Sequence, residues 1–214
     1  MRAIPFNDTK RILTIFMPEE GVVSMATRAF SPTLSHLMSA TSPLTCSEFI
    51  FRRGRGDVYR LLEANTLADY LTLRTNANRL DCAGEIVQIL LKSQLPGKPA
   101  PLLYDLTKAY IDHLQHCSHP DNLLASFYLK LFKHEGLLHW AAHCAVCTEH
   151  PVSFFCKGQG TCTQHRNYPA HPLTSQEWQL IGLLADSRSF QILEGLHLDS
   201  SMMSHLRRFF SELL

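Results

Sequence analysis

Four side chains that commonly bind metals lie close together between residues 144 and 165, in the run CAVCTEHPVSFFCKGQGTCTQH. Cys144 and Cys147 form a C-x2-C pair, and Cys162 and His165 form a C-x2-H pair. Each pair can bring two donor atoms to one tetrahedral ion, and the segment between the pairs is long enough to fold back. Because four protein ligands leave no coordination position for water, the spacing predicts a structural zinc ion.

The residues around these pairs leave the ligand set open. Cys156 lies between the pairs and could replace His165 as the fourth ligand, although the C-x2-H pairing is geometrically simpler. His143 and His150 flank the first pair and could compete, but we expect them to be exposed loop histidines. The alternative to a metal site is a group of reduced cysteines that are neighbours by chance.

The composition is that of an ordinary globular protein. The chain has 214 residues, of which 45% are hydrophobic and 18% charged. No apolar run is long enough to span a membrane, and MRAIPFNDTKR is unlike a signal peptide. The 7 cysteines are an odd number, and those at 144, 147, 156 and 162 crowd into one region, which favours a reducing compartment. We therefore expect a soluble, cytoplasmic protein without a membrane partner. A formal charge of +1 means that any polyanion must bind to a local patch.

The first part of the chain has the pattern of a small sheet. Short apolar or alternating runs at residues 11–16, 22–28, 44–52 and 58–63 are separated by turn residues, which is typical of strands. The turns fall at residues 18–21 and 53–57. Several short strands in about seventy residues predict a Greek-key barrel of the OB type, in a domain of residues 1–75.

The rest of the chain, residues 76–214, has helical periodicity, so the predicted fold class is α+β. Apolar stripes run along residues 80–90 and 102–110, and a further helix is expected from Asp121, as its cap, to Glu135, with Gly136 ending it. The zinc-binding insertion would occupy residues 140–168. A capping box at Thr174 and Glu177 predicts the next helix, and a last helix is expected from about Ser201.

Basic residues gather at the second predicted hairpin, in the run RRGRGDVYR. Together with cations of the earlier strands they would form a groove for a phosphate backbone, because the arginine fork pairs with phosphate oxygens and stacks on bases. Phe30, Phe51 or Tyr59 would be available for stacking. The alternative is a solvated turn that protects a sheet edge. The candidate nucleic-acid-binding residues are Lys10, Arg11, Arg28, Arg52, Arg53, Arg55 and Arg60.

The chain has no recognisable catalytic motif. The phosphate-binding loop, the dinucleotide fingerprint, the nucleophile elbow and the H-E-x-x-H pair are all missing from the sequence. We therefore expect a binding protein and not an enzyme.

The order of the parts resembles the bacterial recombination mediator family RecO over nearly the whole chain. The resemblance rests on FNDTKRILTIFMPEEGVVSMATRAF, on FRRGRGDVYRLLEANTLADYL, on FYLKLFKHEGLL, and on CAVC with the later CTQH. The first stretch matches the family's hairpin pattern at Leu13, Thr14, Phe16, Glu19, Glu20 and Gly21. Three features depart from the family. Few charges follow Arg28, the first strand is short or begins upstream, and His165 stands where many relatives have cysteine.

The resemblance implies a DNA-repair protein with an N-terminal OB fold and a helical domain that contains a zinc ribbon. It implies binding to single- and double-stranded DNA, annealing of complementary strands, and association with the nucleoid. It also implies contact with the tail of single-stranded DNA-binding protein, and cooperation with RecR in loading RecA.

A pocket for the acidic tail would need an apolar floor and a cation. The helix 121–135 offers Phe127, Lys130, Leu131 and Lys133 for this purpose. A different class of function is a zinc-stapled adaptor that binds proteins and does not touch DNA. Affinity for an acidic peptide without affinity for bare DNA would favour that adaptor.

Overall fold

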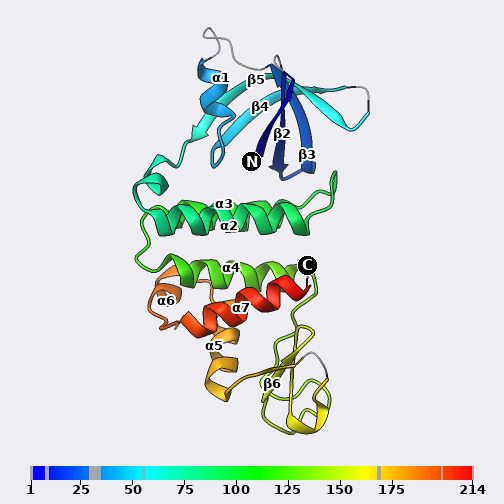
Figure 1. Cartoon of the computed structure of the whole chain (residues 1–214), viewed down its shortest axis with the longest axis vertical. Coiled ribbons are helices and arrows are strands. Elements are labelled where there is room, and N and C mark those ends of the chain that lie inside the picture. The colour runs from blue at the N-terminus through cyan, green and yellow to red at the C-terminus, as the bar shows by residue number, and fades with distance from the viewer. Residues whose placement is uncertain are drawn as a thin grey trace. The chain divides into compact units, whose positions relative to one another are not determined.

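The computed structural model describes residues 2–7, 10–28, 35–54, 56–167, 170–198 and 200–213. The chain forms two compact units, Met1–Gln115 and His116–Leu214, which are described separately here (Figure 1). The first unit contains a five-stranded sheet and two long helices. The second contains a group of helices and a small three-stranded sheet.

The large sheet has the strand order β1-β2-β3-β5-β4. Its pairs are antiparallel except for β3 with β5, which run parallel. This arrangement is that of a partly open Greek-key sheet of the OB type, as the sequence predicted. Among the described residues, β1 pairs only with β2, so no ladder joins β1 to β4. The strands are β1 (Arg2–Asn7), β2 (Lys10–Met17), β3 (Gly21–Arg28), β4 (Cys46–Arg53) and β5 (Val58–Ala68).

Alternation along these strands decides which face of the sheet is buried. On β2, Leu13 and Ile15 are buried, and Met25 on β3 and Leu61 on β5 lie in the same apolar cluster. Because successive strand residues point to opposite faces, the residues between them belong to the outer face. Helix α1 (Ser35–Ala40) packs against β5.

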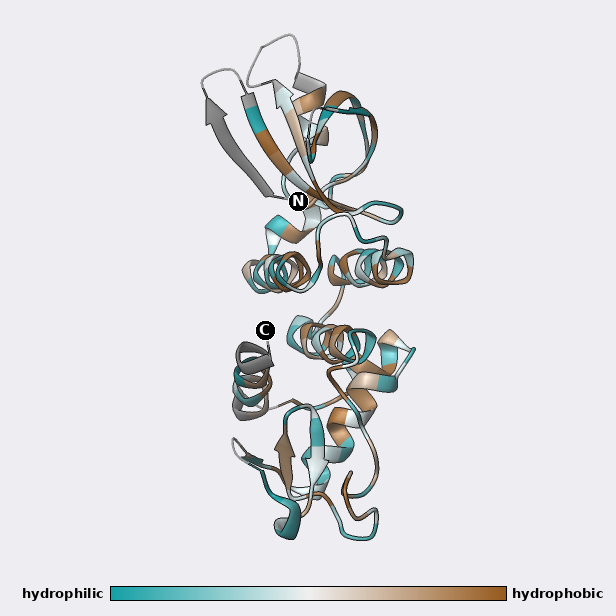
Figure 2. Cartoon of the chain, turned by 90° about the vertical axis from the view of Figure 1, so that its right-hand side faces the viewer, coloured by the Kyte–Doolittle hydropathy of each residue, from teal (hydrophilic) through white to brown (hydrophobic). Residues whose placement is uncertain are grey.

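Two helices complete the first unit. A 3-10 turn, η2 (Leu71–Thr75), leads into α2 (Ala77–Ser93), whose first turn is capped by the side chain of Asn76. Helix α3 (Pro101–Leu114) contacts both α2 and β2. Figure 2 shows α2 and α3 end-on and side by side. The predicted inward stripe on α3 was wrong at Leu102, which is 75% exposed, and at Ala109, which is also exposed. The buried residues are Leu103, Tyr110, Ile111 and Leu114.

Helix α4 (Pro120–His134) is the core element of the second unit. It packs against α5 (Ser175–Asp186), α6 (Phe190–Glu194) and α7 (Ser200–Leu213). The helix was predicted to begin with Asp121 as cap, but His119 takes that position and Pro120 opens the first turn. The helix ends at His134, and Gly136 after the C-cap residue Glu135 has a φ of +72°, which is readily adopted only without a side chain. The capping box of Thr174 and Glu177 is confirmed at the start of α5.

The small sheet of the second unit has the order β7-β6-β8. Its strands are β6 (Phe154–Cys156), β7 (Gln159–Thr161) and β8 (His171–Pro172), and a 3-10 turn, η3 (Thr163–His165), follows β7. Gly158 makes the tight β6–β7 turn with φ +79°. A Cβ at this position would lie 1.7 Å from the carbonyl oxygen of Leu137, so only glycine fits. No helix within the described residues is long and apolar enough to cross a membrane.

Candidate metal centre and nucleic-acid interface

The second unit brings together the four residues that the spacing selected. The ligand atoms of Cys144, Cys147, Cys162 and His165 all lie within 4.8 Å of one another. The Sγ atoms of Cys147 and Cys162 are 4.0 Å apart. His165 Nδ1 lies 3.3 Å from Cys162 Sγ and 3.7 Å from Cys144 Sγ. The cluster can therefore hold a metal ion.

These distances suit a tetrahedral ion with thiolate and imidazole ligands, of which zinc is the common example in proteins. Zinc binds thiolates at about 2.3 Å and imidazole nitrogens at about 2.0–2.1 Å in tetrahedral geometry. Tetrahedral angles then separate two sulfurs by about 3.8 Å, and a sulfur from a nitrogen by about 3.6 Å. The separations in this cluster lie close to both values. Three thiols and an imidazole are also ligands that suit structural zinc, whereas calcium and magnesium bind oxygen ligands.

Backbone hydrogen bonds hold the first pair in place. Cys144 N–H donates to His150 O at 3.0 Å, and Thr148 N–H donates to Cys144 O at 2.9 Å, which closes the turn that contains Cys147. Ala145 N–H donates to Gly160 O on β7 at 2.9 Å. Because β7 leads directly to Cys162, this bond ties the two ligand pairs to each other.

The local environment favours the thiolate at two positions. Burial opposes ionisation of Cys144, but backbone N–H groups of Cys147, Val146 and Cys162 outweigh it and lower the pKa of this thiol to about 6. Backbone N–H groups of Glu149 and His150 lower the pKa of Cys147. Thiolates are the form that binds metals, so these donors prepare the first pair for a cation.

The second pair differs in its electrostatics. Burial raises the pKa of the Cys162 thiol. Contact with the Cys144 and Cys147 sulfurs raises the pKa of His165. Binding of a cation would release protons from these groups, because metal ligands must be deprotonated.

The structure separates Cys156 and His143 from the group of four, whereas His150 stays beside it. The Sγ of buried Cys156 lies 3.3 Å from Thr161 Oγ1 and 3.3 Å from Asn167 O, outside the group of four. His143 and His150 are exposed, as expected. His150 Nδ1 does lie 3.4 Å from Cys147 Sγ, so it is a neighbour of the cluster.

Strand register arranges several of the predicted DNA-binding cations. Arg52 on β4 is the direct partner of Arg60 on β5, and both side chains are exposed. Lys10 on β2 is the partner of Arg28 on β3. Strand β5 also pairs with β3, where Arg60 is the partner of Ala26, two residues before Arg28. Positions 10, 28, 52 and 60 therefore share the outer face by parity and cross four neighbouring strands.

The other predicted cations have different surroundings. Arg11 has the inward parity of Leu13, and its Nη2 donates to Thr41 Oγ1 at 2.9 Å. This corrects its assignment to the groove, because its guanidinium holds the segment after α1. Arg53 is exposed, with its Cζ 5.9 Å from the ring centroid of Tyr59. Arg55 lies outside the described residues.

The candidates for base stacking are also corrected in part. Tyr59 is only 9% exposed, and its hydroxyl donates to Glu20 Oε2 at 2.7 Å. Its ring packs edge-on against Phe51 at 5.1 Å between centroids. Tyr59 therefore belongs to the core and does not offer a face to a base. Phe30 lies outside the described residues.

The predicted tail pocket on α4 is not available at the surface. Phe127 and Leu131 are fully buried, so they cannot form an open apolar floor. Lys130 Nζ donates to Ser187 O at 2.6 Å, and Lys133 forms an ion pair with Asp186. The expectation failed because the stripe that binds a peptide and the stripe that packs a core have the same helical spacing.

The fold and the cluster together define an α+β protein in which an OB-type sheet precedes helices that carry a metal-binding ribbon. Two family descriptions cover most of the sequence: Recombination protein O N terminal over residues 1–70 and Recombination protein O C terminal over residues 74–214. The chain belongs to the RecO family, whose curated members act in DNA repair.

Curated relatives agree with this assignment. The DNA repair protein RecO of Chlamydia pneumoniae is 22% identical over 196 residues, covering 90% of this chain and 77% of the relative. That of Chlamydia muridarum is 23% identical, covering 85% of this chain and 79% of the relative. That of Syntrophomonas wolfei is 26% identical, covering 69% of this chain and 58% of the relative.

The family descriptions and the packing divide the chain at different places. The descriptions leave a gap at residues 71–73, whereas the compact units divide between Gln115 and His116. Packing groups α2 and α3 with the sheet because α3 contacts β2. The predicted boundary near residue 75 stays a prediction.

Proposed function

We propose that the protein is a recombination mediator that binds single- and double-stranded DNA on the outer face of β2, β3, β5 and β4. A local basic patch would hold the sugar-phosphate backbone of the DNA. The net charge of the whole chain, +1, is too small to attract a polyanion by itself. The observation that carries the proposal is the register pairing of Arg52 with Arg60. Like charges directly opposite on a sheet are unfavourable unless an anion lies between them.

The position of this pair also supports the proposal. OB folds bind oligonucleotides on the face of their second and third strands and at the loop between the fourth and fifth. Arg52 lies at the end of β4, directly before that loop, and positions 10 and 28 lie on the second and third strands. A strand could pass from one set of cations to the other without leaving the face.

The direct test is the salt dependence of binding to a labelled oligonucleotide, measured by fluorescence anisotropy. Replacing two phosphate-contacting arginines reduces the slope of log affinity against log salt by about 1.8 for duplex and about 1.4 for single strands. We expect these changes in the double variant Arg52→Gln, Arg60→Gln. Arg74→Gln is the matched control, because Arg74 is an exposed arginine of the same unit outside this face. Unchanged slopes in the double variant contradict the assigned face.

We further propose that the bound ion is structural zinc held by Cys144, Cys147, Cys162 and His165. The donor set and the separations among its atoms support zinc. A bound ion would contribute folding free energy to the ribbon and supply no reaction. In this proposal the protein makes and breaks no covalent bond.

The remaining parts of the proposal concern annealing and partners, and family membership supports them. The protein anneals complementary strands in the cytoplasm at the nucleoid. It contacts the tail of single-stranded DNA-binding protein and, with RecR, helps to load RecA. The first of these activities is tested by the annealing of two complementary labelled oligonucleotides, with energy transfer between the labels as the signal. Tail binding without any affinity for bare DNA would instead identify a zinc-stapled adaptor.

A further inference from the structure

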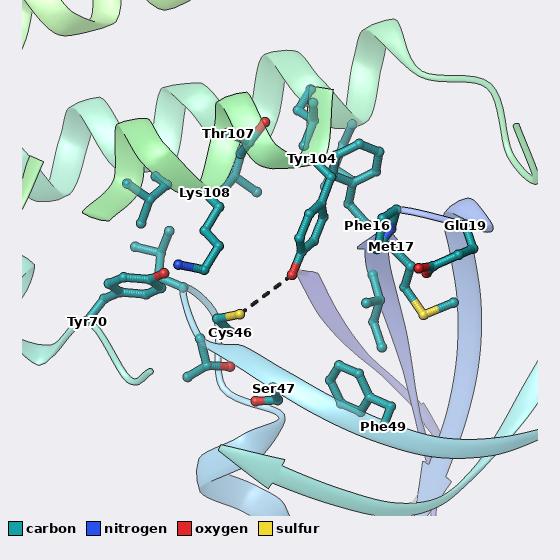
Figure 3. A pocket seen from close by; sticks show the side chains of 18 of the residues that line it. Phe16, Met17, Glu19, Cys46, Ser47, Phe49, Tyr70, Tyr104, Thr107 and Lys108 are labelled. Atoms are coloured by element: carbon teal, nitrogen blue, oxygen red, sulfur yellow. Dashed lines mark hydrogen bonds between the residues drawn. The ribbon is translucent and has the colours of Figure 1, made fainter. Parts of the chain in front are cut away.

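The first unit contains a pocket of about 300 Å³ that the DNA-binding face does not use. Its walls come from β2 and β4 of the large sheet and from α2 and α3 (Figure 3). Pockets of this size lie at the lower end of the range that encloses organic ligands or a partner's anchoring side chain. The cations at positions 52 and 60 do not line it.

The walls of the pocket are mainly apolar and aromatic. Phe16 and Tyr104 form a tilted ring pair with centroids 5.9 Å apart. Phe49 and Phe51 are partly buried and pack against the core of the sheet. Ile111 lies on the helical side. Such walls hold water poorly, so an occupant that replaces the water with an apolar group is favoured.

Most polar groups of the pocket already have strong partners. The hydroxyl of Tyr70 donates to Asp112 Oδ1 at 2.7 Å, and Lys108 Nζ donates to Asp112 Oδ2 at 2.7 Å. The charge of Lys108 is therefore offset by its neighbour. The hydroxyl of Tyr104 lies 3.6 Å from Cys46 Sγ, and a thiol is a weak partner. The phenol keeps capacity for a stronger hydrogen bond.

The other charged side chain that lines the pocket is acidic. Glu19, in the β2–β3 turn, is exposed and lines the pocket. Figure 3 shows Glu19 and Lys108 on opposite sides of Tyr104. Burial, then Cys46, then Asp105 and Glu19 raise the pKa of Tyr104, so the phenol stays neutral and can donate. Glu19 therefore gives its side of the pocket a negative charge.

We propose that this pocket docks an aromatic side chain of a partner protein, from a segment in which Lys or Arg flanks the aromatic residue. The ring would lie against Phe16, Phe49 and Tyr104, which favour offset or edge-on neighbours. A flanking cation would pair with Glu19, and a polar group of the segment would accept from Tyr104. A nucleic acid base is the weaker alternative, because its phosphates would lie beside Glu19.

The binding experiment uses the full-length protein and three capped tripeptides: Lys-Trp-Lys, Glu-Trp-Glu and Lys-Ala-Lys. Nitrogen-15 NMR spectra locate the binding site through the amide shifts, and calorimetry gives the affinity. We expect Lys-Trp-Lys to shift the amides of Cys46, Ser47, Tyr104 and Thr107. The other two peptides should bind at least about tenfold more weakly, which corresponds to roughly 1.4 kcal/mol.

Two variants test separately what the Glu19 carboxylate and the cavity contribute to peptide binding. Glu19→Lys should weaken Lys-Trp-Lys at least about fivefold, because it replaces attraction by repulsion. Glu48→Lys is the control, since Glu48 is an exposed carboxylate on β4 that does not line the pocket. Thr107→Trp fills the cavity from α3 and should abolish the shifts while circular dichroism shows an intact fold.

Three outcomes overturn the proposal: equal affinity for Glu-Trp-Glu, shifts that map away from the pocket, or equal effects of Glu19→Lys and Glu48→Lys. A single-stranded oligonucleotide that shifts the same amides, when the peptides do not, also overturns it and assigns the pocket to DNA. These results are independent of the Arg52 and Arg60 face, whose failure would appear only in the salt slopes.

Discussion

Arg52 on β4 and Arg60 on β5 stand directly opposite each other in an antiparallel strand pair, and both side chains are exposed. Two like charges in this arrangement destabilise a sheet by roughly 0.2–1 kcal/mol. The face that we assign to DNA therefore carries a small cost in the free protein. A bound phosphate chain would relieve the repulsion.

The Arg52→Gln variant should lose DNA affinity because it loses a phosphate contact. It should not lose stability, because it also removes the repulsion between Arg52 and Arg60. The free energy of unfolding of the variant should equal that of the wild type or exceed it by up to about 0.5 kcal/mol at low salt. The difference should shrink at about 1 M salt, where charges are screened within about 3 Å. Urea unfolding at two salt concentrations measures it, with Arg74→Gln as control. A clear loss of stability at low salt would mean that Arg52 has a structural partner.

The metal cluster predicts different outcomes for two cysteines of the same ribbon. Purified protein should contain about one zinc ion, and Cys162→Ser should lose it because a serine hydroxyl is a poor zinc ligand. Cys156→Ser should keep it, since Cys156 contacts Thr161 and Asn167 instead of the cluster. Elemental analysis gives the stoichiometry, and thermal melting with and without a chelator gives the stabilisation. Equal zinc content in the two variants contradicts the ligand set.

The buried phenol of Tyr70 and the half-buried phenol of Tyr104 predict a loss of stability in alkali. Burial, and then the hydrogen bond to Asp112, raises the pKa of Tyr70 above its ordinary value of 10.0. Burial likewise raises the pKa of Tyr104. A raised pKa of an acid stabilises the fold below pH 10, where both states are protonated. That stabilisation is lost as the pH rises above 10, because the unfolded chain then releases protons that the folded protein retains.

The measurement is urea unfolding between pH 8 and pH 11, with tyrosinate absorbance as a monitor of ionisation. Tyr70→Phe should lose less stability over this range than the wild type, although it starts lower because Asp112 loses a donor. A wild-type curve that is flat up to pH 11 would contradict the burial of the phenols.

The sequence predicted the metal cluster well because its signal is local. Cys144 with Cys147, and Cys162 with His165, are fixed by short turns whose geometry depends on few other residues. The choice between His165 and Cys156 was left open, because it depends on the β6–β7 turn. That turn directs Cys156 toward Thr161 and away from the cluster.

The DNA-binding residues were harder to predict because composition does not give strand parity. Arg11 and Lys10 are neighbours in sequence, yet Arg11 shares the inward parity of Leu13 and bonds to Thr41. The pocket of the first unit could not be predicted from the sequence, since Phe16, Cys46 and Tyr104 meet only after the sheet and helices pack. Local patterns specify elements, whereas register and packing decide what each residue faces.

Two glycines with similar backbone angles predict different costs of replacement. Gly158 and Gly136 have φ of +79° and +72°, so alanine is strained at either position by about 1 kcal/mol. Only at Gly158 would the new Cβ also collide with a backbone atom, the Leu137 carbonyl oxygen at 1.7 Å; at Gly136 nothing lies within 4 Å. Gly158→Ala should therefore destabilise the protein by at least about 2 kcal/mol more than Gly136→Ala.

The same pair tests whether the β6–β7 turn positions the metal ligands. Displacing this turn would move β7, which is bonded to Ala145 and leads to Cys162. Gly158→Ala should therefore release zinc to a chromogenic chelator faster than Gly136→Ala, even at temperatures where both variants remain folded. Equal release rates would mean that the ligand pairs are held by their own turns alone, independently of the hairpin between them.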